Sequence, residues 1–161
     1  CHNPRMADVR SVLNQSPPAD SVFRQKRNTM ENIPKLRFAH PTDNLERSIF
    51  FYRDGLGFEI LDRYTEQQGW DGVIFGHRDW PYQIEISQKR GTDPVPRNAT
   101  VNHFLVFSLP EAEHWERRLK ALFDAGFTQV PVPELYNDGA SACYEDPDGY
   151  RVVLRKGFWK K

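Results

Sequence analysis

Glu85 is the residue whose type and position most need a chemical explanation. It lies in residues 82–87, where apolar and polar side chains alternate strictly, a pattern typical of a half-buried strand. The apolar side chains are expected to face packed helices, which leaves Glu85 on the opposite face with Gln83. A carboxylate on a covered face needs a partner. Glu85 is therefore a candidate proton acceptor, ion-pair partner or binding group.

Arginines occur in strand patterns of the same kind. Residues 35–40 alternate with Arg37 on the polar side, and residues 150–155 alternate with Arg151 and Arg155 on theirs. A guanidinium presents forked donors that suit a carboxylate or a phosphate. These three arginines are candidates for holding an anion.

Two histidines and a cysteine are weaker candidates. His40 and His103 fall on the apolar, helix-facing sides of their strands, so the alternation favours structural roles for both. Cys143 has no His or Asp nearby in sequence to activate a thiol, which favours a small buried apolar side chain. Asp146 and Asp148 are expected to form a tight turn.

Two tryptophans near predicted strand ends offer flat rings to a ligand. Trp70 follows the turn at Gly69, and Trp80 precedes the strand that carries Glu85. Flat rings suit aromatic or heterocyclic guests, although a tryptophan also covers a strand edge without binding anything. We prefer Trp70 as the ligand-binding ring.

The elements that must position these residues occur twice. In each half the pattern predicts a strand, a helix and three further strands, and the sequences Leu-Gly-Phe (56–58) and Ala-Gly-Phe (125–127) follow the two helices at matching places. The predicted strands are 35–40, 58–61, 73–75, 82–87, 104–109, 127–130, 141–144 and 150–155, and the helices span 45–52 and 112–122. A half with one helix covers one sheet face only. We therefore expect helices outside and a cleft lined by the other faces.

Length and composition limit the possible functions. A chain of 161 residues corresponds to about one domain, and 22 Lys and Arg balance 22 Asp and Glu, which disfavours nucleic acid and anionic membranes as partners. No apolar run approaches the ~18 residues that span a bilayer, so we expect a cytoplasmic protein. Cys1 and Cys143 lie far apart in sequence, and we expect no disulfide between them.

The chain is expected to divide into a tail and one domain. Residues 1–32 lack an apolar period and are predicted to be a flexible N-terminal tail. The domain spans 33–160, with module one at 35–90, a proline-containing linker at 91–99 and module two at 100–157. One hypothesis is that the native protein begins near Met30; the alternative is a native extension. The intact mass of the native product distinguishes them.

Two motifs resemble a known superfamily. The sequence NLERS at 44–48 followed by FYRDGLGF at 51–58, together with YEDPDGY at 144–150, resembles the vicinal oxygen chelate proteins. These include glyoxalase I, extradiol dioxygenases, and fosfomycin- and bleomycin-resistance proteins. The resemblance covers residues 35–155. It implies an α+β fold of two βαβββ modules that form an open, eight-stranded, barrel-like groove with helices outside.

The resemblance also implies where a metal would bind. The ligand positions of the superfamily's metalloenzymes fall on Arg37, Glu85, Phe104 and Val153, of which only Glu85 can hold a cation. A divalent ion on one carboxylate would be weakly held, because catalytic sites supply three or more protein donors. We therefore expect no metal and no cofactor, a character closest to the superfamily's metal-free members.

The groove residues have two alternative roles. Arg37 and Glu85 are expected to face one groove, as a structural ion pair or, with Arg151 and Arg155, as part of an anion site. We favour the ion pair. The Arg37→Ala variant tests both, since unchanged stability and unchanged binding would exclude both. The predicted ligand-binding residues are Arg37, Trp70, Gln83, Glu85, Phe104 and Arg151.

Three functions follow from these expectations. The first is metal-independent sequestration of a small drug or metabolite, as in antibiotic resistance. The second is a glyoxalase-like lyase or a dioxygenase with a non-standard site at Glu85, and the third is a regulatory subunit. The resemblance further implies a homodimer that completes the groove, with a linker that permits exchange of modules. Elemental analysis of purified protein tests for a metalloenzyme.

Overall fold

The computed structural model describes residues 35–91, 93–96 and 100–158, and its strands and helices belong to one compact unit that begins at Leu36. The predicted tail at 1–32 and the possible start at Met30 lie outside the described residues. Among the described helices, none has the length and apolar character needed to cross a membrane.

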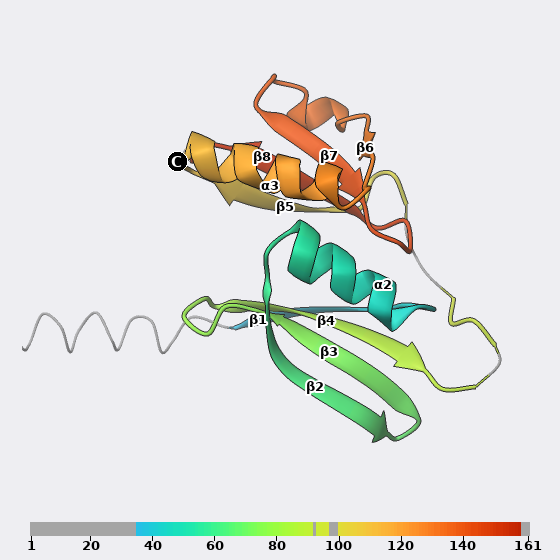
Figure 1. Ribbon diagram of the computed structural model, residues 1–161. Helices are drawn as coiled ribbons and strands as arrows, with labels where there is room; N and C mark the ends of the chain where they lie inside the picture. Colours follow the sequence, from blue (N-terminus) through green and yellow to red (C-terminus); the bar gives the residue numbers. More distant parts are fainter. Residues whose placement is uncertain (1–34, 92, 97–99, 159–161) are drawn as a thin grey trace, which may run out of the picture. The chain divides into compact units, whose positions relative to one another are not determined.

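Module one is a four-stranded sheet with one crossover helix, as its pattern predicts (Figure 1). The strands lie in the order β1-β4-β3-β2, with β1 parallel to β4 and the other neighbours antiparallel. The elements are β1 (Leu36–Pro41), α2 (Leu45–Ile49), the π-helical turn η1 (Phe50–Gly55), β2 (Glu59–Gln67), β3 (Trp70–Gly76) and β4 (Tyr82–Lys89). Asn44 caps α2, since its side chain accepts a hydrogen bond from the backbone N–H of Arg47.

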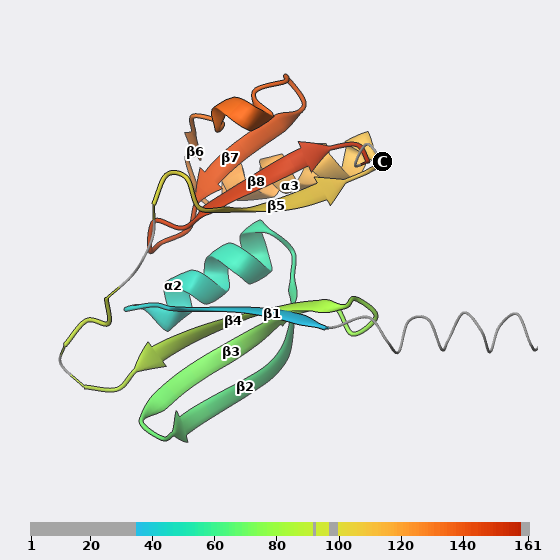
Figure 2. The same ribbon diagram turned by 180° about the vertical axis from the view of Figure 1, so that it is seen from behind.

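Module two repeats this order, and its strands lie in the sequence β5-β8-β7-β6. Its helix α3 crosses one face of the sheet. In the view of Figure 2, β5 and β8 lie in front of α3. The elements are β5 (Phe104–Leu109), α3 (Ala112–Asp124), β6 (Gln129–Val130), the 3-10 helix η2 (Glu134–Tyr136), β7 (Ser141–Glu145) and β8 (Arg151–Lys156). The predicted double βαβββ fold is confirmed.

Some predicted boundaries differ from the structure. The second strand was predicted at 58–61, whereas β2 runs from Glu59 to Gln67 because it pairs along the length of β3 despite two register shifts. The predicted strand at 127–130 is only Gln129–Val130. In both places, pairing with a neighbouring strand sets the length, and local sequence patterns carry little information on pairing.

Both modules contribute to one apolar core. Phe51 of η1 meets Phe127 of module two edge-on at 4.8 Å between ring centroids, and Phe58 meets Phe107 at 5.1 Å. A Cβ added to Gly55 would lie 2.7 Å from the Leu122 side chain, so glycine permits this close approach of η1 and α3. The fully buried members include Phe51, Tyr52, Val73, Phe75, Ile86, Leu122 and Val152.

The shared core joins the helix-bearing sides of the two modules. Apolar residues from these sides of both sheets pack together, and Gly55 of η1 lies close to Leu122 of α3. The face of module one that carries Glu85 and the face of module two that carries Phe104 therefore point away from the common core.

Candidate functional site

The pairing of β1 with β4 brings Arg37 to Glu85. The parallel register sets Arg37 opposite Gln83 and Ala39 opposite Glu85. Arg37 donates from Nε and Nη2 to Gln83 Oε1, at 3.1 and 2.7 Å, and its Nη1 lies 3.3 Å from Glu85 Oε2. The guanidinium and the carboxylate share one face of the sheet, as the strand alternation predicts.

Tyr64 is a further member of this site that sequence reasoning missed. It lies on β2, and its hydroxyl donates to Glu85 Oε1 at 2.8 Å. Burial, followed by the hydrogen bond to Glu85, raises the pKa of Tyr64 to about 12. A Cβ at Gly72 would overlap the Tyr64 ring, so glycine at this β3 position lets the ring lie across the sheet. Gly72 was expected to precede the strand at 73–75, whereas it lies within β3, where a glycine often marks a close approach of another group.

These residues line a depression of about 410 Å³. Arg37, Trp70 and Glu85 border it, while Gln83 holds the Arg37 guanidinium from beside it. Ile74 adds an apolar surface, and Asp62 a second carboxylate. Four of the predicted ligand-binding residues are thus together on the open face of module one.

Phe104 and Arg151 lie in a different place. They line a cavity of about 650 Å³ with His40, His103 and Tyr150, along β1 and β5. The Phe104 ring meets Tyr136 of η2 edge-on at 5.5 Å. Two of the predicted ligand-binding residues are therefore separate from the depression that contains Glu85.

The three arginines considered for an anion site have separate partners. Arg151 donates to Glu145 at 3.1 Å, and Arg155 lies 2.9 Å from Asp138. Arg37 is held by Gln83 and Glu85. The structure does not bring the three guanidiniums together in one chain.

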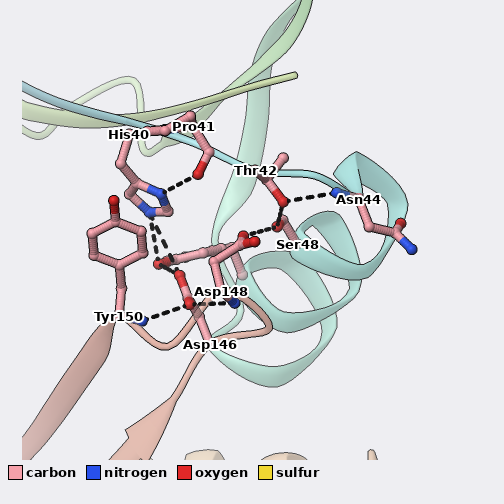
Figure 3. Close-up of polar contacts among 9 residues, drawn as sticks. His40, Pro41, Thr42, Asn44, Ser48, Asp146, Asp148 and Tyr150 are labelled. Atoms are coloured by element: carbon pink, nitrogen blue, oxygen red, sulfur yellow. Dashed lines mark hydrogen bonds and ion pairs between the residues drawn. The ribbon is translucent and has the colours of Figure 1, made fainter. Parts of the chain in front are cut away.

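A buried polar network connects the two modules beside these sites (Figure 3). Asp146 was predicted to form a turn, and its Oδ1 does accept hydrogen bonds from the backbone N–H groups of Asp148 and Tyr150, both at 2.9 Å. Its Oδ2 also accepts from Tyr52 Oη of module one at 2.8 Å and lies 3.6 Å from His40 Nε2. The turn prediction is correct, but it missed this connection between modules.

His40 has the structural role that the alternation favoured. It is 4% exposed, its Nδ1 lies 3.2 Å from Pro41 O, and its Nε2 lies 3.3 Å from Tyr52 Oη. Burial lowers the pKa of His40, although the nearby Asp146 opposes this shift. Burial also raises the pKa of Asp146, against the hydrogen bonds that it accepts.

The residues present do not fit a catalytic metal. At the implied ligand positions, Arg37 has a positively charged side chain, and the side chains of Phe104 and Val153 have no atoms that could coordinate a metal. His40 is on the helix-facing side of β1, away from Glu85. Among the residues that the structure describes, no group of three His, Cys, Asp or Glu side chains has the geometry to hold an ion.

Comparison with known proteins agrees with the fold. Residues 36–87 match the sequence-family model of the YycE-like N-terminal domain, and residues 102–156 match that of the YycE-like C-terminal domain. YycE of Bacillus subtilis (strain 168) is 32% identical over 131 residues, which cover 80% of this chain and 92% of YycE. The crystal structure of a YycE protein of unknown function from B. subtilis matches with a TM-score of 0.70 and 31% identity, over 80% of this chain and 94% of that one.

More distant structures share the fold alone. The trypanothione-dependent glyoxalase I of Leishmania major matches with a TM-score of 0.61 and 18% identity, over 78% of this chain and 88% of that one. TnmS3, an antibiotic-binding protein from Streptomyces sp. CB03234, matches with a TM-score of 0.55 and 17% identity, over 79% and 97%. The double βαβββ fold and these neighbours define a protein of the vicinal oxygen chelate class. Within that class, the chain belongs to the YycE-like family.

Proposed function

We propose that this protein binds a small organic molecule, a drug or a metabolite, on the open face of module one without using a metal. The observation that carries the proposal is that both carboxylate oxygens of Glu85 already have partners within the protein. Its two oxygens are engaged by Arg37 and Tyr64, so a guanidinium takes the position beside the carboxylate that a cation would need. The site offers hydrogen-bonding groups and rings to a ligand instead of open coordination positions.

Stability alone does not explain this cluster. The Arg37 side chain is 48% exposed, and ion pairs in such positions contribute about 0–1 kcal/mol to folding. The cluster nevertheless has four polar side chains from three strands in one connected arrangement. Polar groups that converge beside Trp70 and Ile74 in a depression of about 410 Å³ are typical of a small-molecule site.

We also propose that a second copy of the chain completes the site. β1 and β5 are edge strands of their sheets, and Leu36 on β1 is 65% exposed. An exposed apolar edge favours pairing with another chain. A homodimer that joins the module-one face of one copy to the module-two face of the other would place Phe104 opposite Glu85. Likeness to an antibiotic-binding protein supports a drug as one class of ligand.

A thermal-shift screen tests the binding proposal. A ligand of the native state raises the melting temperature by mass action, and we would screen antibiotics, thiol conjugates and catechols. A hit should lose at least about tenfold in affinity in Arg37→Ala and Trp70→Ala. Arg47→Ala, an exposed arginine on α2, is the matched control. Equal affinity in all variants would contradict the proposed site.

The enzymatic alternative and the dimer have their own measurements. Turnover of a hit that disappears in Glu85→Gln, while binding persists, would favour a lyase or dioxygenase role for Glu85 over sequestration. Sedimentation analysis tests the dimer. If the groove is shared, mixing Arg37→Ala with Phe104→Ala chains restores one intact site per mixed dimer, so binding recovers in part. A monomer that binds the hit with full affinity would exclude a shared groove.

A further inference from the structure

A second cavity lies on the helix-bearing side of the sheets, on the opposite side of module one from Glu85. Its volume is about 560 Å³, and it is bordered by α3 and by the segment that joins β3 to β4. Phe58, Phe107 and Leu154 supply an apolar floor. The size and the apolar floor are typical of a site for a small organic ligand.

One wall of this cavity is basic. His114, Arg117 and Arg118 are spaced three and four residues apart on α3, so they share one helical face, and all three line the cavity. Arg117 pairs loosely with Glu113 at 3.9 Å. The lining contains two arginines but only one acidic residue, Glu59.

Arg118 is the most informative of these residues. Its guanidinium lies against Gly57, where any Cβ would overlap it and where φ is +78°, so glycine is needed for both space and backbone conformation. Arg118 is half-buried, and among the described residues it forms no ion pair with an acid. A half-buried guanidinium without a counter-charge costs free energy that a bound anion would offset.

The opposite wall is aromatic. Trp80 is 51% exposed and lies 5.3 Å from the Tyr82 ring and 5.9 Å from the His77 ring, measured between centroids. Tyr82 is half-buried, and within the described part of the chain its hydroxyl has no hydrogen-bond partner. An exposed indole beside a half-buried hydroxyl gives a ligand ring a surface to stack on and a donor to bind.

We propose that this cavity binds a small aromatic anion, with Arg118 as the anchor for its carboxylate or sulfonate and Trp80 as the stacking surface for its ring. The anionic group lies against α3, where Arg117 and His114 add further donors. The ring lies over the apolar floor beside Tyr82. This site is separate from the depression at Glu85 and is formed by residues of a single chain.

The test compares two probes of the same shape, 2-naphthoate and its neutral amide, 2-naphthamide. Titration is followed by NMR through the indole N–H signals, with the Trp80 signal assigned from the Trp80→Phe variant. We expect Trp80 to shift and Trp70 to stay unchanged, and naphthoate to bind at least about tenfold more tightly than the amide. Arg118→Gln should abolish this difference, and Arg118→Lys should retain part of it.

Two controls separate this site from the other. Arg47→Gln removes an exposed arginine of α2 and should change neither affinity, and Arg37→Ala should leave naphthoate binding intact whatever it does at the Glu85 site. Equal affinities for the two probes in the unmodified protein would overturn the proposal. So would a naphthoate preference that survives Arg118→Gln, or shifts that move Trp70 instead of Trp80.

Discussion

Replacing Tyr52 with Phe removes one hydroxyl from the buried network that joins the modules. That hydroxyl donates to Asp146 Oδ2 at 2.8 Å and lies 3.3 Å from His40 Nε2. The variant keeps the ring and its packing against Phe51 and Phe75. The change therefore isolates the hydrogen bonds from the apolar core.

The expected loss follows from the charge and burial of Asp146. A hydrogen bond to a charged group contributes about 1.5–3 kcal/mol, and the buried Asp146 Oδ2 loses its one close donor. The two backbone N–H groups on Oδ1 remain. We expect the free energy of unfolding to fall by about 2 kcal/mol and the melting temperature by roughly 5–10 °C.

Urea unfolding followed by circular dichroism measures this change. Tyr82→Phe is the matched control, because the Tyr82 hydroxyl has no hydrogen-bond partner within the described residues, and we expect a change below about 0.5 kcal/mol. Equal losses in the two variants would refute the assignment of Asp146 and Tyr52 as a stabilising link. An unchanged slope with denaturant in both variants confirms that only stability has changed.

Two further predictions follow from buried groups. In Gly72→Ala, the new methyl group displaces the Tyr64 ring from Glu85, so the free energy of unfolding falls by about 1–3 kcal/mol and the pKa of Tyr64 moves from about 12 back toward 10.0. Ultraviolet titration of tyrosinate measures this pKa. An unmoved pKa would contradict the overlap between the methyl group and the ring. The pKa of His40 is lowered in the folded state, so below the ordinary histidine pKa of 6.5 the unfolded chain binds more protons than the folded chain. The free energy of unfolding should therefore fall as the pH drops below 6.5, by at most about 1.4 kcal/mol per pH unit. Urea unfolding of His40→Gln at several pH values should show that the free energy of unfolding depends less on pH than in the unmodified protein. An unchanged pH dependence would exclude His40 as its source.

Local patterns were sufficient for much of module one. Strict alternation in residues 82–87 predicted the faces of β4 correctly, and it set Arg37 and Glu85 on one side of the sheet before any pairing was known. The register of β1 against β4 then brought the two groups within 3.3 Å. Tyr64 was missed because β2 was predicted to end at residue 61, and its extension depends on pairing with β3.

The roles of polar residues in turns were less accessible. Asp146 was expected to close a turn, and local sequence supports that role because an Asp side chain bonds to backbone N–H groups just after it. Its bond to Tyr52 spans 94 residues, and no local pattern contains that contact. Arg118 is a similar case, since its position against Gly57 depends on the docking of α3 beside module one.

Sequence alone established the duplicated βαβββ order, the faces of the alternating strands that carry Arg37 and Glu85, and the absence of a full metal-ligand set at the positions implied by the resemblance. It did not establish which faces of the two modules meet. Alternation distinguishes the two sides of a sheet, but the choice of partner for the apolar side depends on how shape and area match between distant segments. In this chain the helix-bearing faces pack together, which separates Glu85 from Phe104 and creates the basic, aromatic cavity beside α3.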